Sequence, residues 1–449
     1  MRQTLFLIPQ EFFGLPLAGF GWLLIAWTIV SIILLAALIR RQGWNKETSS
    51  YLPMIIIVAV VIAFGLPMFV AQHGGIPIRG YGVMLLAAVV AGVSFASHRA
   101  QKMGLSSDAI YSLAFWMFIP GILGARIFFV AEYWDEFFYV EGNLKATFFN
   151  AINFTEGGLV VYGSLIGGAV GFAAFCYRYK LPPLALADLI APSLFLGLCL
   201  GRIGCLLNGC CYGGVCDLPW AIPFPEGSPP YQRQLENGEF FGVRLTQNNR
   251  GDIAVGKIRK DSPAQSGLLN VGDVIVKIND AEPEAGKDKR GEPYTAMMAA
   301  NRLMLDASRS GVLRLQKSDG TIVRILLPKS ATWSVPVHPT QIYASLNALI
   351  LFFFAAYYYP TRKHDGEVIA ISLGIYAITR YLLELIRTDE LSFAGTGLTI
   401  SQNVSIAIFT LALVTLLYLR RRPPHTIWPL PSSKPVGNQP AGESVPSAN

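Results

Sequence analysis

Charged residues are scarce in this chain and unevenly placed. They make up 14% of its 449 residues, whereas an ordinary soluble domain carries roughly a quarter. The mean hydropathy is +0.43, and 52% of the residues are hydrophobic. So little charge excludes an ordinary soluble globular protein, and so apolar a chain is not a disordered one. The remaining class is a polytopic α-helical membrane protein whose charge-rich stretch, 217–337, is an insert that faces water.

Histidine and cysteine are also few, and their placement excludes several common sites. No two of the five histidines have metal-ligand spacing, and the His-Glu-x-x-His motif of zinc intramembrane proteases is absent. The six cysteines all lie between Cys176 and Cys216, unlike the disulfide framework of a secreted domain. Within this stretch Cys205, Cys210 and Cys211 lack the paired spacing of zinc sites. We therefore predict no metal and no cofactor, and structural cysteines that are either free or joined in one disulfide such as Cys211–Cys216.

Nine apolar runs are long enough to be membrane-spanning helices. They are 17–39, 52–70, 81–97, 109–133, 158–177, 184–207, 343–359, 368–386 and 400–419. Loops after the odd-numbered runs are rich in arginine and lysine, which places them and the C-terminus in the cytoplasm and the insert on the far side. Because the net charge of +7 is explained by this topology, no nucleic-acid partner is predicted. The Pro- and Ser-rich tail, 423–449, is predicted to be disordered.

Residues from about 240 to 329 of the insert alternate as β-strands do. Strands are expected at 253–258 and 271–279, a helix at 294–308, and a last hairpin formed by 312–316 and 321–326. This pattern resembles a PDZ domain of the kind attached to bacterial envelope proteases. The resemblance implies an extended peptide ligand bound by strand addition, with Phe241, Gly242 and Val243 in the carboxylate-binding loop. The alternative is a spacer or a regulatory cover.

Ionisable side chains within membrane runs are expensive and by default indicate function. Tyr376, Arg380, Glu384 and Arg387 are spaced by four, four and three residues, which places them on one face of a helix. Arg202 lies near the far-side end of its run, where a guanidinium suits a phosphate. A buried structural ion pair is the alternative, but two arginines against one glutamate favour function.

Other polar and small residues have more local roles. Arg126 adds a further cation, whereas Asp188 is predicted to be structural. Glycines recur at every fourth position from Gly163 to Gly171, a pattern typical of close helix packing. His338 begins a segment that re-enters the membrane, and a lone histidine at an interface is more often a cap than a base.

These segments together resemble prolipoprotein diacylglyceryl transferases, which lipidate the lipobox cysteine of bacterial preprolipoproteins. The matching segments, in family order, are Arg79–Gly82, Gly124–Arg126, Gly157–Gly167, Asp188–Pro192, Gly201–Gly204 with Asn208 and Gly209, His338–Tyr343, and Arg380–Arg387. The family commonly has His, Asn and Glu where this chain has Tyr162, Cys205 and Cys210. The resemblance covers the membrane core, predicted in 79–216 and 338–422. It does not explain the two extra helices predicted in 1–78 or the insert in 217–337, and the predicted tail is 423–449.

The resemblance implies transfer of a diacylglyceryl group from phosphatidylglycerol to a cysteine thiol, in the bacterial inner membrane with the insert in the periplasm. The candidate catalytic residues are then Arg202, Arg380 and Tyr162. The candidate substrate-binding residues are Tyr81, Arg126, Asn208, His338, Tyr376, Glu384 and Arg387. The partners are phosphatidylglycerol, a preprolipoprotein signal peptide and a peptide ligand of the PDZ-like domain. The general base stays open between Tyr162, His338, water and the substrate phosphate.

Two other classes compete with an enzyme. A transporter with a polar path would show an internal repeat between its halves, and no convincing repeat is found. A non-catalytic scaffold would act through the PDZ-like domain alone.

Overall fold

The structure is a computed structural model, and it describes residues 4–43, 46–67, 75–132, 134, 160–248, 250–260, 262–265, 268–287, 293–327, 332–387 and 397–428. The chain divides into two compact units. The first unit comprises residues 1–85 and 203–341, and the second comprises residues 86–202 and 342–449.

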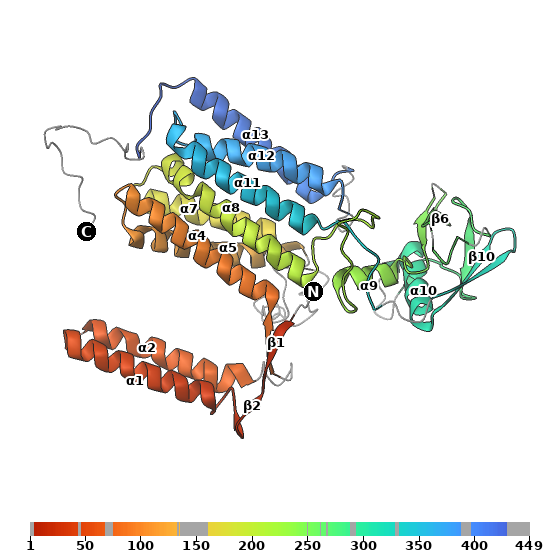
Figure 1. The fold of residues 1–449 in the computed structure, drawn as a ribbon, viewed down its shortest axis with the longest axis horizontal. Helices are drawn as coiled ribbons and strands as arrows, with labels where there is room; N and C mark the ends of the chain where they lie inside the picture. Colours follow the sequence, from red (N-terminus) through yellow and green to blue (C-terminus); the bar gives the residue numbers. More distant parts are fainter. Residues whose placement is uncertain are drawn as a thin grey trace. The chain divides into compact units, whose positions relative to one another are not determined.

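The second unit is built from α-helices (Figure 1). Its helices are α4 (Gly80–Lys102), α5 (Ser107–Glu132), α7 (Val161–Tyr179), α8 (Pro183–Asn208), α11 (Thr340–Tyr358), α12 (Glu367–Glu384) and α13 (Ile400–Arg420), of which α4, α8 and α11 also contribute residues to the first unit. Buried residues of α4, α5, α7, α8, α11 and α12 form one apolar core. Phe175, Leu186, Leu189 and Leu351 are each no more than 2% exposed. The helices α7, α8 and α11 therefore share one apolar interior.

Six helices among the described residues are long and apolar enough to cross a membrane. They lie at Trp22–Arg40, Gly80–Lys102, Ser107–Glu132, Pro183–Asn208, Thr340–Thr361 and Ile400–Arg420. Large apolar side chains such as Phe115, Ile127 and Leu411 are two-thirds exposed on their outer faces, as expected for surfaces that contact lipid. The chain is therefore a polytopic helical membrane protein. The other three predicted runs correspond to α7, to α12 and to the helical segment 46–65.

The helices α5 and α7 approach each other at backbone distance. A Cβ atom placed on Gly163, Gly167 or Gly171 would lie 2.2, 2.0 or 1.9 Å from a carbonyl oxygen of α5. Only glycine leaves room for such an approach, which is a common packing mode between helices in membranes. The predicted close-packing stripe is confirmed, and its partner is α5.

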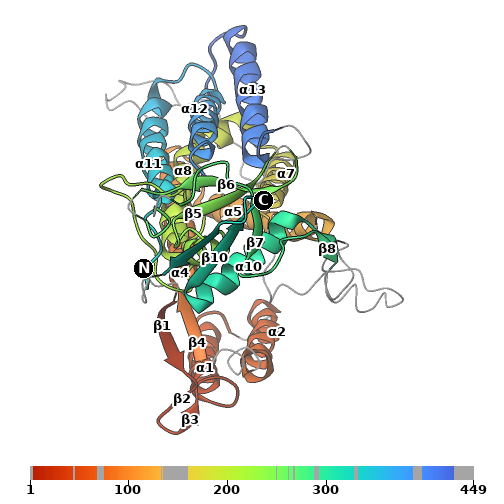
Figure 2. The ribbon, with the colours of Figure 1, turned by 90° about the vertical axis from the view of Figure 1, so that its right-hand side faces the viewer.

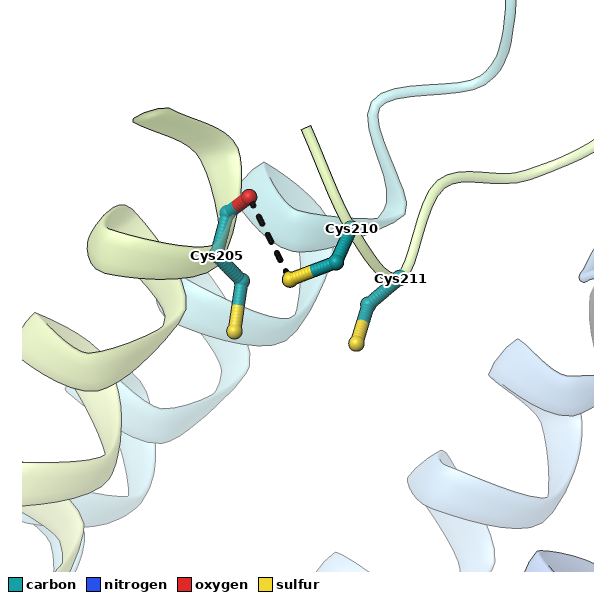
Figure 3. Close-up of side chains that lie close together, drawn as sticks. All are labelled: Cys205, Cys210 and Cys211. Carbon is teal, nitrogen blue, oxygen red and sulfur yellow. Dashed lines mark hydrogen bonds between the residues drawn. The ribbon is translucent and has the colours of Figure 1, made fainter. Parts of the chain in front are cut away.

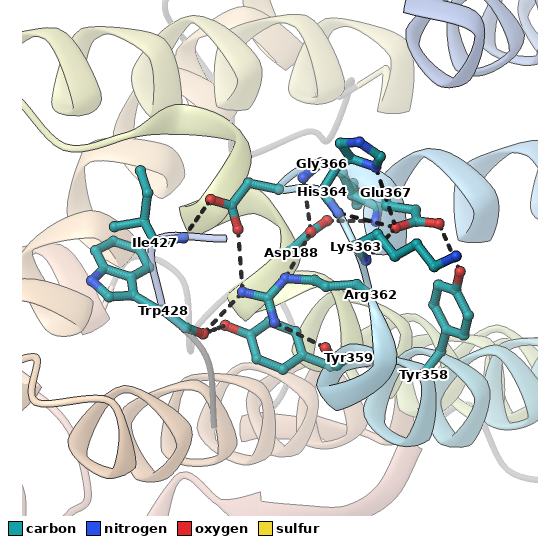
Figure 4. A network of polar contacts seen from close by, with 12 residues as sticks. Asp188, Tyr358, Tyr359, Arg362, Lys363, His364, Gly366, Glu367, Ile427 and Trp428 are labelled. Carbon is teal, nitrogen blue, oxygen red and sulfur yellow. Dashed lines mark hydrogen bonds and ion pairs between the residues drawn. The ribbon is translucent and has the colours of Figure 1, made fainter. Parts of the chain in front are cut away.

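A buried carboxylate fixes the start of α12. Asp188 of α8 is fully buried and accepts hydrogen bonds from the backbone N–H groups of Gly366 and Ile369, both at 2.8 Å (Figure 4). Its carboxylate also lies 3.4 Å from the guanidinium of Arg362. A carboxylate at a helix N-terminus satisfies unpaired donors and interacts favourably with the helix dipole. The predicted structural role of Asp188 is confirmed.

The residues that follow α13 bind to the same cluster. The backbone N–H of Ile427 donates to Asp365 at 2.8 Å, and Arg362 donates to the carbonyl oxygen of Trp428 at 2.9 Å (Figure 4). Residues 423–428 begin the tail that was predicted to be disordered, and in the structure they make these contacts; the rest of that tail lies outside the described residues. A buried guanidinium needs acceptors, and this short segment supplies one although its composition suggests a flexible tail.

The N-terminal part of the first unit contains strand pairing that sequence reasoning missed. Strand β1 (Thr4–Pro9) pairs antiparallel with β4 (Gly75–Arg79), and β2 (Glu11–Phe12) pairs with β3 (Leu15–Pro16). Between them run α1 (Trp22–Gln42), α2 (Lys46–Val60) and the π-helical turn η1 (Val61–Gly65). The indole of Trp27 in α1 donates to the Ile55 carbonyl of α2 at 3.1 Å. The β1–β4 ladder therefore joins the two ends of a helical hairpin.

The insert forms a small α+β fold with its own core. Its elements are α9 (Pro229–Glu236), β5 (Val243–Gln247), β6 (Ile253–Ile258), β7 (Ile275–Ile278), β8 (Gly286–Lys287), β9 (Pro293–Tyr294), α10 (Ala296–Ser310), β10 (Val312–Lys317) and β11 (Ile322–Leu326). Strand β5 pairs with β6, and β10 lies between β7 and β11, all antiparallel (Figure 2). Apolar side chains such as Ile278, Met304 and Leu313 fill the core. The predicted strands, helix and final hairpin of this region are confirmed, with boundaries shifted by a few residues.

The segments that enter and leave the insert pair with each other. Ile222 and Val337 exchange backbone hydrogen bonds of 3.1 and 3.2 Å. Further out, the N–H of Glu226 donates to the carbonyl oxygen of Thr332 at 3.0 Å. These paired segments, 215–226 and 332–337, form a stem for the insert.

Candidate active site

A buried ion cluster at the end of α12 contains three of the predicted residues. Arg380 donates through Nη1 to Oε2 of Glu384, and Nη1 of Arg387 lies 3.5 Å from the same oxygen. The Glu384 and Arg387 side chains are 1% and 7% exposed. Glu384 therefore pairs with both arginines, whereas the sequence left open which of the two it would contact. Arg387 itself lies in the turn beyond α12, not within the helix as predicted, because the helix ends at Glu384.

The cluster extends through Ser401 to α7. Nη2 of Arg380 donates to Oγ of Ser401 at 2.7 Å, and the phenol oxygen of Tyr162 lies 2.5 Å from the same Oγ. Ser401 is 3% exposed, and a capping box between Thr399 and Gln402 fixes the start of α13 at this point. Sequence reasoning missed Ser401. The Thr399-x-x-Gln402 capping pattern is a signal that could have located the start of α13, but it gives no indication of the contact with Arg380.

Arg126 and Tyr162 lie where α5 and α7 cross. Arg126 is 7% exposed, and its guanidinium carbon lies 5.5 Å from the ring centroid of Phe129. The backbone N–H of Val160 donates to the carbonyl oxygen of Ala125 at 3.2 Å, which ties the start of α7 to α5 beside Arg126. The glycine contact between the two helices therefore fixes the backbone positions from which the side chains of Arg126 and Tyr162 extend.

Two contacts between α8 and α12 relate the positions of Arg202 and Arg380 along their helices. The rings of Phe195 in α8 and Tyr376 in α12 are in contact, with centroids 6.2 Å apart. Arg202 follows Phe195 by two helical turns, and Arg380 follows Tyr376 by one. The Asp188 contact joins the starts of α8 and α12, and each arginine is 14 residues, or about 21 Å, beyond that contact, counting from Asp188 and Gly366. The two contacts differ by three residues in the offset they give, so the backbones at Arg202 and Arg380 lie within about one turn of each other along the two helices. The sequence alone does not show this, because it depends on how α8 and α12 are aligned.

Three predicted substrate-binding residues belong to the first unit. Tyr81 lies in the first turn of α4, is 39% exposed, and its ring lies 3.2 Å from a Cβ placed on Gly204 of α8. Asn208 is the last residue of α8. The carbonyl oxygen of His338 accepts a hydrogen bond from the N–H of Gly213 at 2.9 Å, so the re-entering segment is paired with the loop that follows α8.

The predicted carboxylate-binding loop of the insert is mostly internal. Phe241 and Val243 are 0% and 1% exposed and pack in the insert core, and Gly242 has a φ of +80°. The N–H groups of Phe241 and Gly242 donate to the carbonyl oxygens of Gly238 and Glu239 at 3.0 and 3.1 Å. A carboxylate bound at this loop would therefore have to replace two existing hydrogen bonds.

Fold and site together define a polytopic helical membrane protein with a cation-rich polar cluster among its helices. Its sequence matches the family model described as prolipoprotein diacylglyceryl transferase over residues 67–418. It is 33% identical to the phosphatidylglycerol–prolipoprotein diacylglyceryl transferase of Rhodopirellula baltica, over 94% of this chain and 90% of that relative. Proteins of the same name from Trichormus variabilis and Mycobacteroides abscessus are 34% and 31% identical, over 41% and 42% of this chain and 62% and 52% of their own lengths.

The chain belongs to the prolipoprotein diacylglyceryl transferase family. The Rhodopirellula baltica alignment leaves only 6% of this chain uncovered. The uncovered part is shorter than the N-terminal helical region and shorter than the insert. That alignment therefore extends into both additions, whereas the Trichormus variabilis alignment covers 41% of the chain.

Proposed function

We propose that this protein transfers the diacylglyceryl group of phosphatidylglycerol to the lipobox cysteine thiol of preprolipoproteins, with Arg380 binding the phosphate. The observation that carries the proposal is the fixed guanidinium of Arg380, which Glu384 and Ser401 hold from two sides. Arg202 of α8 supplies a second cation, within about one helical turn of Arg380 along the two helices. Arg380, Arg387 and Glu384 together carry a net positive charge where little water screens it, which stabilises a phosphate leaving group.

The transfer forms one bond and breaks another. The substrate thiolate attacks a glycerol carbon, a C–S bond forms, and the C–O bond to phosphate breaks as its electron pair leaves with glycerol phosphate. Arg380 and Arg202 stabilise the charge that develops on this leaving group. Tyr162 reaches Arg380 through Ser401 and donates a hydrogen bond to the phosphate. The thiol proton passes to water, to the phosphate itself, or through Tyr162.

An apolar groove between α12 and α13 suits an acyl chain of the lipid. It has a volume of about 210 Å³ and is lined by Ala377, Ile378, Tyr381, Leu382, Ser405, Ile406 and Phe409. Tyr381 follows Arg380 directly, and Ser405 donates to the carbonyl oxygen of Ser401 at 2.7 Å, one turn earlier in α13. The groove therefore begins one turn from the ion cluster, so a lipid whose phosphate binds Arg380 places a chain along it.

Glycerol phosphate release tests this assignment. Purified protein is mixed with phosphatidylglycerol and a lipobox peptide, and a peptide with serine in place of the cysteine is the control substrate. Arg380→Ala should lower the rate about 100- to 1,000-fold, as does removal of a donor that stabilises developing charge. Arg380→Lys should retain part of the activity, and Arg178→Ala, which removes an exposed arginine at the end of α7, should leave it unchanged. Full activity of Arg380→Ala in folded protein would overturn the assignment.

A second function is favoured by a groove in the insert. A cavity of about 260 Å³ lies between β5 and α10 and is lined by Arg233, Asn237, Arg244, Leu245, Thr246, Gln247, Met297 and Asn301. Among the described strands, β5 pairs only with β6, so its other edge is open to an added strand. The insert is PDZ-like and binds an extended peptide along β5, with two arginines that favour an acidic ligand. Arg244→Glu should weaken binding of an acidic peptide in titration, and unchanged affinity would contradict this ligand class.

The orientation proposed for the chain is nine spans with the insert in the periplasm and the C-terminus in the cytoplasm of the bacterial inner membrane. It is supported by basic residues at the C-terminal ends of α1, α4, α7 and α13. Alkaline phosphatase is active only outside the cytoplasm. A fusion within the insert should therefore be active and one after Trp428 inactive, and the reverse pattern would invert the topology.

A further inference from the structure

Three cysteines at the end of α8 form a group of side chains that the proposed transfer chemistry does not use. The Sγ atoms of Cys205, Cys210 and Cys211 all lie within 4.8 Å of one another (Figure 3). Within the described part of the chain, no other three His, Cys, Asp or Glu side chains meet in this way. No disulfide is present among the six cysteines, so the expected alternative of a Cys211–Cys216 bond is not formed.

The end of α8 explains how two adjacent cysteines join a third. The N–H groups of Gly209 and Cys210 both donate to the carbonyl oxygen of Cys205, at 2.9 and 3.2 Å. Gly209 and Cys211 have φ angles of +78° and +59°. In an extended chain adjacent side chains point to opposite sides, but this left-handed turn brings both thiols back toward Cys205. The spacing rule that predicted no metal site does not anticipate such a turn.

The start of α11 holds the backbone of this turn in place. Oγ1 of Thr340 donates to the carbonyl oxygen of Cys211 at 2.6 Å, and Nε2 of Gln341 donates to that of Cys210 at 2.7 Å. The Cys210 thiol is directed at the carbonyl oxygen of Cys205, 3.7 Å away, which turns its sulfur toward that residue (Figure 3). The three sulfurs are therefore held on a preorganised backbone, as a metal site requires.

We propose that Cys205, Cys210 and Cys211 bind one thiophilic metal ion, of which zinc is the best match, through three thiolates. A Zn–S bond of about 2.3 Å places the sulfurs of a tetrahedral site about 3.8 Å apart, so side-chain rotation closes the remaining gap of at most about 1 Å. Thiolate ligands select zinc or monovalent copper, whereas calcium and magnesium require oxygen donors, and no carboxylate belongs to this group.

Binding releases the thiol protons and occupies three of the four tetrahedral positions. The fourth position takes water or another small donor. The ion ties the last turn of α8 to the loop that follows it. A disulfide is a poorer match to the geometry, because it would join two of the sulfurs and exclude the third.

Metal analysis of the full chain in detergent tests the proposal. After zinc loading and passage over a chelating resin, the wild-type protein should retain about one zinc ion per chain. Cys205→Ser, Cys210→Ser and Cys211→Ser should each lose most of it. Cys216→Ser is the matched control, because Cys216 lies in the same segment but outside the group of three, and it should retain the ion.

Two measurements on the wild-type protein keep the proposal testable if a variant fails to fold. Cobalt titration should give cobalt–thiolate charge-transfer bands and the intense visible bands of a tetrahedral site. Zinc should slow maleimide modification of the three cysteines at least tenfold, without changing modification of Cys216. No retained ion, no cobalt spectrum and unprotected thiols would overturn the proposal. So would mass spectrometry showing a disulfide between two of the three cysteines in freshly purified protein that retains no ion.

Discussion

Replacement of Gly167 by alanine should separate α5 from α7. A Cβ atom at this position would lie 2.0 Å from the carbonyl oxygen of Pro120 and 2.7 Å from its carbonyl carbon, whereas ordinary contact begins at 3.4 Å. Both atoms belong to the backbone and cannot rotate away. The helices must therefore move apart by about 1.4 Å, and overpacking of this kind costs typically 1–3 kcal/mol. We expect a loss at the upper end of this range.

The displacement should also affect the reaction, because α5 carries Arg126 and α7 carries Tyr162. A misplacement of about 1 Å can cost about 100-fold in rate. Thermal unfolding in detergent and glycerol phosphate release measure the two effects. Gly197→Ala is the control, since its Cβ atom would meet Ala88 at an ordinary 3.7 Å and alanine favours a helix over glycine. If Gly167→Ala were as stable and active as this control, the close approach of the helices would be refuted.

Three further changes probe other parts of the molecule. Ser401→Ala removes a hydroxyl hydrogen-bonded to a guanidinium, which is worth about 1.5–3 kcal/mol, so kcat in glycerol phosphate release should fall about 10- to 100-fold, and an unchanged kcat would exclude this role. A chain ending at Arg422 should melt at a lower temperature than one ending at Trp428, because Arg362 loses an acceptor; equal melting temperatures would contradict the docking of 423–428. Hydrogen bonds from the backbone N–H of Asn270 and then from Lys317 lower the pKa of Asp273 in the folded insert. The stability that this carboxylate gives the insert is therefore present above the ordinary aspartate pKa of about 3.9. It is lost as pH falls through the lower pKa of the folded state. Proteolysis of the wild-type insert should therefore become faster as pH falls through the folded pKa of Asp273, and the rate should depend less on pH in Asp273→Asn. An equal pH dependence in the two proteins would refute the link between this carboxylate and the stability of the insert.

Local patterns in the sequence predicted the local parts of this site. Arg380 and Glu384 are four residues apart, and a helix places such side chains within contact distance whatever surrounds it. The β10–β11 hairpin was predictable for the same reason, since its turn contains Gly320 with a φ of +85°. The ion pair and the hairpin could both be predicted because each depends on only a few residues that are close in the sequence.

Contacts between distant segments could not be predicted in this way. Ser401 follows Tyr162 by 239 residues, and only the packed helices show that their oxygens meet. The β1–β4 ladder and the binding of Trp428 to Arg362 likewise join segments that no local pattern relates. The cysteine group is local in sequence, but it depends on the left-handed conformation of Cys211, which a non-glycine residue seldom adopts.

The paired stem of the insert has a consequence for the history of the chain. Because Ile222 and Val337 exchange hydrogen bonds, the insert begins and ends at neighbouring points. A domain with adjacent ends can enter a surface loop in one genetic event without stretching the connection between the flanking helices. The membrane helices and the insert can then diverge at separate rates, so such a module can be gained, exchanged or lost within a lineage while the membrane part keeps its fold.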